Sequence, residues 1–297
     1  MPVQLNVDTF AFRRRKGFVL SPVSAVKVLE SPTGEFELPV DIGLGIARAV
    51  KTVSEVSLNL EGATHRLTLG ILERLAGSDK LLYVGPEGVY FVEVRDEKGY
   101  YKLKYLGERV APTLEINGVH MHNITGIDPL SDAERKVRML GVARGEKVLD
   151  VCTGLGYTAI RALERGAEVV SIEKDPNVLY IAEHNPFSEK LSRASILLGD
   201  AFDVVGELPE EYFDKVLHDP PVFAFAGHLY SAEFYTRLWR VLKKGGRVFH
   251  YTGAPGKHRG VNIQRGVVER LRRAGFRIVR VIKDYGVIAE KPRRSPY

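Results

Sequence analysis

The sequence contains one cysteine, Cys152, three methionines and no long apolar run. A single thiol cannot form an internal disulfide, and no cysteine cluster is present to hold zinc. A transmembrane helix needs about 20 apolar residues in succession, so none is predicted. Residues 1–17 lack the apolar core of a signal peptide. We therefore expect a cytoplasmic protein without structural zinc.

What the sequence does contain is typical of a globular protein. Hydrophobic residues make up 44% and charged residues 27% of its 297 residues. Chains of this length usually fold around more than one hydrophobic core, which favours two domains. The many charged side chains and the scarcity of thermolabile ones are typical of a thermophilic source.

The net charge of +6 is distributed unevenly. Residues 1–128 carry 15 basic and 16 acidic side chains, whereas residues 129–297 carry 28 basic and 21 acidic ones. From Lys257 onward there are 12 basic and 3 acidic residues. Such a concentration is suited to phosphate groups, so it favours a nucleic acid partner over a plain solvated surface.

Residues 1–125 are predicted to form a β-rich α+β domain. The strand-forming runs 89–94 and 100–105 flank the turn signal 96–99 and predict a hairpin. A second hairpin is predicted around Asn117-Gly118. Two helical segments, at about 42–52 and 67–76, interrupt the strands. This part carries no recognisable catalytic motif.

Residues 123–130 are punctuated by Gly126 and Pro129 and predict a hinge. Ser131 and Glu134 then have the spacing of a capping box, which predicts a helix from Ser131 to about Val142. A second domain is therefore expected over residues 126–297.

In that second domain, strand and helix patterns alternate. The predicted strands are 147–152, 168–173, 195–198, 215–218, 247–251, 276–283 and 286–290. One helix is predicted to begin near Tyr157, and a short one is predicted to follow the strand that ends at 198. The other predicted helices span about 177–184, 231–242 and 261–274. This order predicts an α/β fold with a doubly wound, seven-stranded, mainly parallel sheet. Ligands of such sheets bind at the carboxyl ends of the strands.

The first predicted strand is followed by the glycine turn, residues 150–157, with the sequence Asp-Val-Cys-Thr-Gly-Leu-Gly-Tyr. Gly154 and Gly156 allow a tight turn and close approach of a ligand to the backbone. The helix that follows presents free N–H groups to an anion. Taken alone, the turn also fits a dinucleotide-binding fingerprint or a purely structural role.

Acidic residues follow the next two strands. Glu173 lies 19 residues after Gly154, where a carboxylate can accept both ribose hydroxyl protons of a nucleoside. Asp200 follows the third strand and is placed to accept a hydrogen bond from an adenine amino group, to cap the next helix, or both.

The fourth strand ends in Asp219-Pro220-Pro221. Proline has no N–H, so this loop offers carbonyl oxygens and the Asp219 carboxylate as acceptors. Such a rim is suited to an incoming amine or amide N–H group. The later run Leu242-Lys-Lys-Gly-Gly246 is interpreted as structural, with Gly245 ending a helix.

In this order and spacing, the glycine turn, Glu173, Gly199-Asp-Ala201, Asp219-Pro-Pro221 and the Lys-Lys-Gly-Gly run resemble class I S-adenosylmethionine-dependent methyltransferases. The resemblance covers about residues 131–290. Within that superfamily the chain resembles a predicted archaeal methyltransferase family related to spermidine synthases. The finer resemblance lies in the segments 218–221 and 245–253.

The resemblance implies a Rossmann-like fold that binds S-adenosylmethionine and a role for each motif. The glycine turn would hold the methionine part of the cofactor, Glu173 its ribose, and Asp200 and Ala201 its adenine. The full implied cofactor set is Asp150, Thr153, Gly154, Leu155, Gly156, Tyr157, Glu173, Lys174, Asp200 and Ala201. Asp219, Pro220 and Pro221 would be catalytic, accepting N–H hydrogen bonds from an amino nitrogen that is to be methylated.

One position departs from the resemblance: Val222 stands where such enzymes carry an aromatic residue that stacks on the target. Phe223 or Phe225 is a candidate replacement in substrate binding. The implied substrate is RNA, either tRNA or rRNA, or a small amine. Two alternatives remain open: a spermidine-synthase-like aminopropyltransferase acting on a polyamine, and a non-catalytic binding module. His120 and His122 are interpreted as ordinary strand histidines, and no metal site is predicted.

Overall fold

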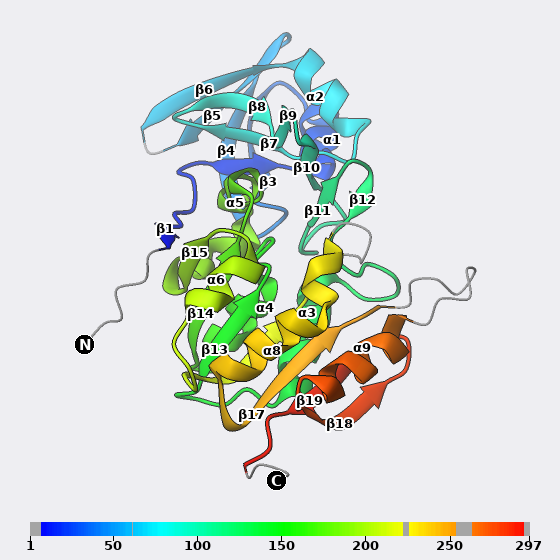
Figure 1. Ribbon diagram of the computed structural model, residues 1–297. Helices are drawn as coiled ribbons and strands as arrows, with labels where there is room; N and C mark the ends of the chain where they lie inside the picture. The colour runs from blue at the N-terminus through cyan, green and yellow to red at the C-terminus, as the bar shows by residue number, and fades with distance from the viewer. Residues whose placement is uncertain (1–6, 61, 222–225, 254–262, 294–297) are drawn as a thin grey trace. The chain divides into compact units, whose positions relative to one another are not determined.

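The structure is a computed structural model that describes residues 7–60, 62–221, 226–253 and 263–293 (Figure 1). These residues form two compact units. The N-terminal unit comprises residues 12–130 and 177–189, and the C-terminal unit comprises the chain up to Ala11, residues 131–176, and the chain from Lys190 onward. None of the helices in the described ranges has both the length and the apolar character needed to cross a membrane.

The N-terminal unit combines three antiparallel sheets with short helices. Its sheets have the strand orders β3-β4-β5-β6, β2-β7-β8 and β12-β11-β10-β9. The strands are β2 (Phe18–Leu20), β3 (Gly34–Val40), β4 (Gly45–Lys51), β5 (Glu55–Leu60), β6 (Ala63–Thr68), β7 (Leu82–Gly85), β8 (Gly88–Phe91), β9 (Glu93–Asp96), β10 (Gly99–Lys104), β11 (Thr113–Ile116) and β12 (Val119–His120). The helices are α1 (Pro22–Glu30), α2 (Leu69–Ala76) and α5 (Pro176–Glu183). The 3₁₀ helix η1 (Pro186–Arg193) follows α5, and its residues from Lys190 onward belong to the C-terminal unit.

Local sequence explains several of these elements. Ser21 and Ser24 form a reciprocal capping box, which starts α1 at Pro22. The predicted hairpins are confirmed: β9 pairs with β10 across Glu97-Lys98, and β11 pairs with β12 across Asn117-Gly118. The predicted strand 89–94 is interrupted at Val92, so its two halves, β8 and β9, belong to different sheets.

The predicted helix at 42–52 is wrong, whereas the helix predicted at 67–76 is confirmed as α2. The first segment forms β4, which pairs with β3 at seven successive positions and also with β5. Ala49 of β4 is buried in the core that these strands share with α1 and α2. Tertiary pairing has overridden the helix propensity of the alanines in this segment.

The C-terminal unit is built on one sheet with the strand order β1-β15-β14-β13-β16-β17-β19-β18. Its strands are β1 (Asp8–Phe10), β13 (Lys147–Val151), β14 (Glu168–Glu173), β15 (Ser195–Leu198), β16 (Phe213–His218), β17 (Leu242–Tyr251), β18 (Arg277–Ile282) and β19 (Gly286–Glu290). Its helices are α3 (Pro129–Leu140), α4 (Tyr157–Glu164), α6 (Ala201–Glu207), α8 (Ala232–Val241) and α9 (Ile263–Arg273), with the 3₁₀ helix η2 (Gly227–Tyr230).

The predicted doubly wound α/β fold is confirmed. Strands β13 to β17 run parallel, and β19 is antiparallel to both β17 and β18. The sheet has eight strands rather than seven, because β1 pairs antiparallel with β15 at the edge. That strand is only three residues long, so it carries too little periodicity to be recognised in the sequence.

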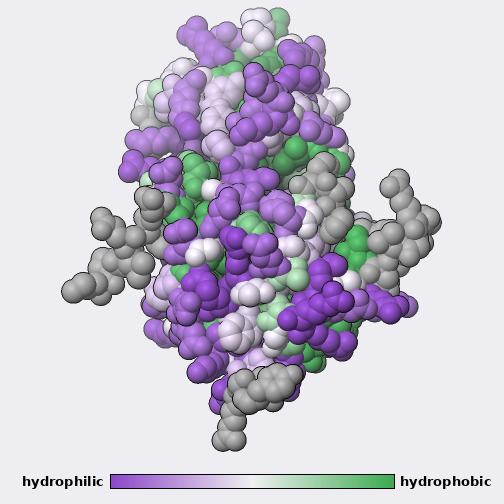
Figure 2. All heavy atoms as spheres, in the orientation of Figure 1, coloured by the Kyte–Doolittle hydropathy of each residue, from purple (hydrophilic) through white to green (hydrophobic). Residues whose placement is uncertain are grey.

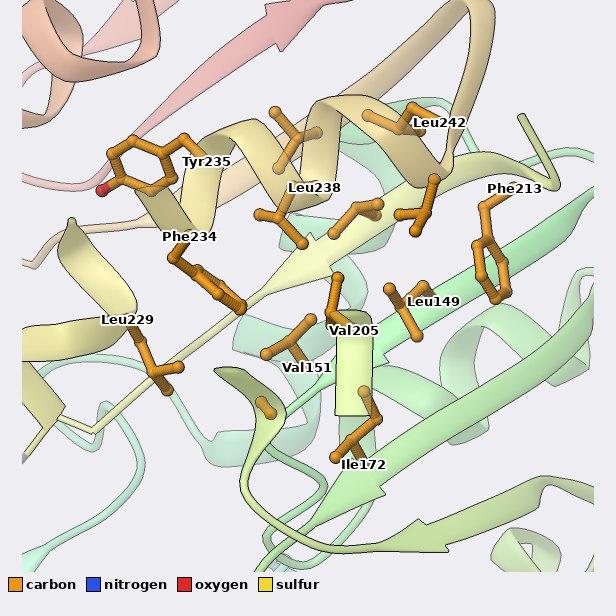
Figure 3. Close-up of a cluster of buried hydrophobic side chains, with 14 of the residues drawn as sticks. Leu149, Val151, Ile172, Val205, Phe213, Leu229, Phe234, Tyr235, Leu238 and Leu242 are labelled. Carbon is orange, nitrogen blue, oxygen red and sulfur yellow. The ribbon is translucent and has the colours of Figure 1, made fainter. Parts of the chain in front are cut away.

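The core of this unit lies between the sheet and the helices that connect its strands (Figure 3). Leu149 and Val151 of β13 face Val205 of α6, with Ile172 of β14 beside them. From α8, Phe234, Tyr235 and Leu238 are completely buried. These contacts fix the carboxyl ends of β13, β14 and β16 relative to one another, which is where the predicted site residues lie.

Two predicted helix boundaries need correction. Helix α3 begins at Pro129 rather than after Ser131, and the Leu130 N–H donates to Asp128 Oδ1, so Asp128 precedes the first turn. Gly245 does not end a helix. Helix α8 ends at Val241, and Gly245 lies within β17 with φ +82°, where its N–H donates to the carbonyl of Lys291.

Candidate active site

The glycine turn connects the end of β13 to the start of α4. Cys152, Gly154 and Gly156 all have left-handed backbone conformations, with φ of 70°, 55° and 79°. A Cβ on Gly156 would lie 2.6 Å from a methyl group of Leu191, so close packing as well as φ requires glycine there. Cysteine is uncommon in this conformation, and such residues concentrate at functional sites.

A buried hydrogen-bond network lies beneath this turn. Asp150 Oδ1 accepts from the Thr158 hydroxyl and Oδ2 from the Ser171 hydroxyl, each at 2.7 Å. Thr153 and Ser171 are joined at 2.6 Å. Asp150 is fully buried, and burial raises its pKa to about 7. Its carboxyl group therefore ties β13 to β14 and to the first turn of α4, while its predicted contact with the cofactor stays a prediction.

Glu173 joins the end of β14 to the same turn. Its carboxylate accepts hydrogen bonds from the backbone N–H groups of Gly154, Lys174 and Asp175 at 3.0, 2.9 and 3.1 Å. Burial raises the pKa of Glu173, although these N–H groups act in the opposite direction. A carboxylate has about four acceptor positions, so capacity remains for a ribose hydroxyl group.

Asp200 follows β15 and has the capping role expected from the sequence. Its Oδ1 accepts from the Phe202 N–H at 2.9 Å at the start of α6, and His228 Nε2 lies 3.1 Å from the same atom. Lys174 Nζ is 3.9 Å from Oδ2. Asp200 and Lys174 thus connect the ends of β15 and β14, the two positions predicted to hold adenine and ribose.

Asp219, Pro220 and Pro221 lie at the end of β16. Val151 of β13 pairs with His218 of β16, so Cys152 and Asp219 begin neighbouring loops at the same edge of the sheet. The carbonyl of Pro221 accepts a hydrogen bond from the Tyr230 hydroxyl at 3.1 Å. Phe223, Phe225 and Val222 lie outside the described residues.

Asp219 has a partner that the sequence analysis missed. Lys136 of α3 lies with its Nζ 2.5 Å from Asp219 Oδ2 and 2.8 Å from Asp132 Oδ2. The ammonium group is also 4.0 Å from the ring centroid of Tyr251. Its sequence signal was weak: an aspartate and a lysine four residues apart on one helix.

The charges of this group influence one another strongly. Burial lowers the pKa of Lys136, but the two carboxylates outweigh burial and the net effect raises it. Burial raises the pKa of Asp219, and Lys136 opposes that shift. Asp132 also accepts a hydrogen bond from the Tyr285 hydroxyl at 2.8 Å. Lys136 therefore stays protonated at neutral pH, and the carboxylates are held in place by it.

Two histidines beside Asp219 are structural. The rings of His218 and His250 stack with centroids 4.3 Å apart, and both residues are fully buried. Burial lowers the pKa of His218 to about 3 and lowers that of His250 as well. Both rings are therefore neutral near pH 7. The aromatic residues Tyr230, Phe234 and Tyr235 are buried in the core.

Comparison with known proteins supports the methyltransferase fold that the strand order and the residues at the strand ends indicate. Residues 148–246 match the family described as a methyltransferase domain. The fold is similar to that of spermidine synthase from Thermotoga maritima, with a TM-score of 0.52 and 15% identity over 68% of this chain and 72% of that one. The protein is a class I S-adenosylmethionine-dependent methyltransferase, as its motifs predicted, and S-adenosylmethionine is its cofactor.

Among relatives, protein MJ1233 of Methanocaldococcus jannaschii is 49% identical over 231 residues, which cover 76% of this chain and 79% of MJ1233. The chain belongs to the family of this archaeal protein. A putative ribosomal RNA large subunit methyltransferase of the same organism, MJ1653, is 38% identical over 87 residues, or 28% of this chain and 23% of that protein. The chain thus matches less than a quarter of the length of that relative.

Proposed function

We propose that this methyltransferase transfers the methyl group to an amino nitrogen of RNA. The observation that carries the proposal is the position of Asp219-Pro220-Pro221 at the carboxyl end of β16, directly beside the glycine turn that follows β13. The two prolines present acceptors without donors, and a neutral amino group presents two N–H donors.

The described residues at the strand ends fit the cofactor. Gly154 and Gly156 have the left-handed conformations of a tight turn and carry no side chains, which lets a ligand approach this backbone closely. Glu173 and Asp200 place one carboxylate after β14 and one after β15, next to each other in the sheet. We assign the ribose to Glu173, the adenine to Asp200 and Ala201, and the methionine part to Asp150–Gly156, with Tyr157 and Lys174 at the margins.

Bound S-adenosylmethionine supplies a sulfonium methyl group. The role of the protein is to hold the acceptor nitrogen in line with it, because orientation supplies much of the rate in such transfers. Asp219 Oδ1 and the Pro220 carbonyl would each accept one N–H of the target, which leaves the nitrogen lone pair free. The C–S bond of the sulfonium would break as the new N–C bond forms, and the cofactor would leave as the neutral thioether. The Asp219 carboxylate would stabilise the positive charge on the nitrogen until that nitrogen releases one proton to water.

The basic surface of the C-terminal unit supports RNA as the partner. Arg272 and Arg273 end α9, while Arg280 on β18 and Lys283 just after it follow on the neighbouring edge strand, and all four are exposed. Within the described part of the chain these four side chains make no ion pair with a carboxylate. Helix α9 packs on β18 and β19, and Figure 2 shows hydrophilic residues over the position of α9. Unpaired exposed cations are suited to phosphate contacts.

The test is incubation with methyl-labelled cofactor and total cellular RNA, followed by digestion to nucleosides. We expect label in an N-methylated nucleoside and a decrease in kcat of about 100-fold for Asp219→Ala, the usual loss when one such group is removed. Asp203→Ala, which removes an exposed carboxylate on α6, serves as the matched control and should retain wild-type activity.

A second candidate function is aminopropyl transfer to a polyamine, favoured by the fold similarity to spermidine synthase and by the carboxylates Asp132 and Asp219. Incubation with decarboxylated cofactor and labelled putrescine distinguishes the two functions. Aminopropylated product, together with unlabelled RNA in the first assay, would refute the proposed methylation of RNA.

A further inference from the structure

Lys136 occupies a position with every feature of a binding site for an ammonium ion. Its Nζ lies between two carboxylate oxygens, 2.8 Å from Asp132 and 2.5 Å from Asp219. The face of Tyr251 lies 4.0 Å away. Carboxylate pairs and aromatic faces are the groups by which proteins bind primary and quaternary ammonium ligands.

The lysine reaches this position from inside the protein. Its side chain is only 5% exposed, whereas that of Asp219 is 23% exposed. Lys136 contacts Oδ2 of Asp219, and within the described residues Oδ1 receives no hydrogen bond. One oxygen of Asp219 is thus held by the lysine, and the other is left to a substrate.

The lysine also determines the charge of the site. Asp132 and Asp219 together carry two negative charges, and Lys136 neutralises one of them. Arg135, whose guanidinium group lies 4.1 Å from the ring centroid of Tyr285, adds a further positive charge next to the hydroxyl that bonds Asp132. Without Lys136, the buried carboxylate of Asp132 and the half-buried one of Asp219 would attract a protonated amine. With Lys136 in place, the net charge of the site is close to zero, and the site presents a single hydrogen-bond acceptor, Asp219 Oδ1.

We propose that Lys136 is a specificity-determining residue: its tethered ammonium group fills the cation position formed by Asp132, Asp219 and Tyr251, so that the site rejects protonated alkylamines and accepts a neutral amino group. This inference rests on the proposed function, because it concerns the amino group that Asp219 receives. It adds the selection rule that separates a neutral nucleobase amine from a charged polyamine.

The test is the variant Lys136→Ala, which leaves both carboxylates and an empty space of lysine length. We expect this variant to bind n-butylammonium at least about ten-fold more tightly than the wild type by calorimetry, because the desolvated carboxylates regain a partner. The gain should disappear in Lys136→Ala/Asp132→Asn. Butylammonium should also restore part of the methyl transfer to RNA that Lys136→Ala loses.

Lys291→Ala is the matched control, since Lys291 is equally buried and lies against Trp239 and Glu211 outside the site. Butylammonium should leave its methyl transfer unchanged. If Lys136→Ala folds poorly, butylammonium should raise its melting temperature and leave that of the wild type unchanged.

The proposal is overturned if Lys136→Ala neither binds the amine better than the wild type nor melts higher in its presence. Amine binding by the variant without RNA methylation by the wild type would refute the RNA substrate but not the cation position.

Discussion

Two clusters of ion pairs, one in each unit, differ in whether every carboxylate has a cation of its own. The strand cluster of the N-terminal unit consists of Asp79, Lys80, Glu93, Lys102, Lys104 and Glu115. Lys102 and Lys104 each contact both Asp79 and Glu115, and Lys80 pairs with Glu93, so cations and carboxylates balance. In the Asp132–Lys136–Asp219 cluster of the C-terminal unit, one cation serves two carboxylates.

Under the proposed function, this difference separates structural from functional charge. The strand cluster lies on antiparallel strands and just before them, and its partners are redundant. In the other cluster, Asp219 follows the carboxyl end of a parallel strand, where ligands of this fold class bind, and its Oδ1 accepts no hydrogen bond from any residue that the structure describes. Incomplete pairing at a strand end, rather than density of charge, therefore distinguishes the proposed site.

The sharpest test of this comparison is the loss of one lysine from each cluster. Lys136→Ala leaves the buried Asp132 and the half-buried Asp219 without a cation, so we expect it to lower the free energy of unfolding by about 3–5 kcal/mol. Lys102→Ala leaves Lys104 beside both of its carboxylates, and we expect a loss of about 1 kcal/mol. Urea denaturation measures both. Equal losses would show that the two clusters are energetically alike.

A smaller effect is expected from a pair of glycines with almost the same φ. A Cβ on Gly156, which has φ +79°, would meet Leu191 at 2.6 Å, whereas a Cβ on Gly118 of the N-terminal unit, with φ +80°, would enter open space. Gly118→Ala should cost about 1 kcal/mol from backbone strain alone. Gly156→Ala should cost about 2–3 kcal/mol, because overpacking adds to that strain, and should weaken cofactor binding. Thermal melting and calorimetry with the cofactor test this difference.

One carboxyl group from each unit, Asp150 and Glu115, should respond to pH in opposite directions. Burial raises the folded-state pKa of Asp150 to about 7, so its protonated form is favoured and its contribution to stability falls as pH rises toward 7. Glu115 behaves in the reverse way: burial alone would raise its pKa, but Lys104 and Lys102 lower it, so its contribution is lost at acidic pH.

Asp150→Asn isolates the first of these effects. The stability of the wild type relative to this variant should fall by about 1.4 kcal/mol per pH unit between pH 5 and 6.5. Denaturation curves across this range provide the measurement. A constant difference would mean that Asp150 is already ionised in the folded protein.

The smallest expected effect concerns the basic surface. Arg272→Ala/Arg273→Ala should weaken RNA binding and reduce the slope of log K against log salt by about one to two. Lys27→Ala/Lys98→Ala, which removes two exposed cations from the N-terminal unit, is the control and should leave the slope unchanged. Salt titrations by fluorescence anisotropy measure both variants, and identical slopes would remove this surface from the RNA interface.

The sequence alone determined the alternating strands and helices, the doubly wound sheet and the motifs at its strand ends. These features depend on periodicity and on short local signals: the glycine turn, Asp200 as a helix cap, and the hairpin around Asn117-Gly118 follow from residues a few positions apart. For that reason they could be predicted without any knowledge of long-range contacts.

Tertiary structure alone decided the rest. Segment 45–51 is a strand because two neighbours pair with it. Asp150 is buried because Ser171, 21 residues away, supplies a hydroxyl group beneath the turn. Lys136 meets Asp219 across 83 positions of sequence. Such pairings depend on how α3 packs against the sheet. Burial strengthens the interaction between these charges, which would be weak at the surface, and they form the proposed site.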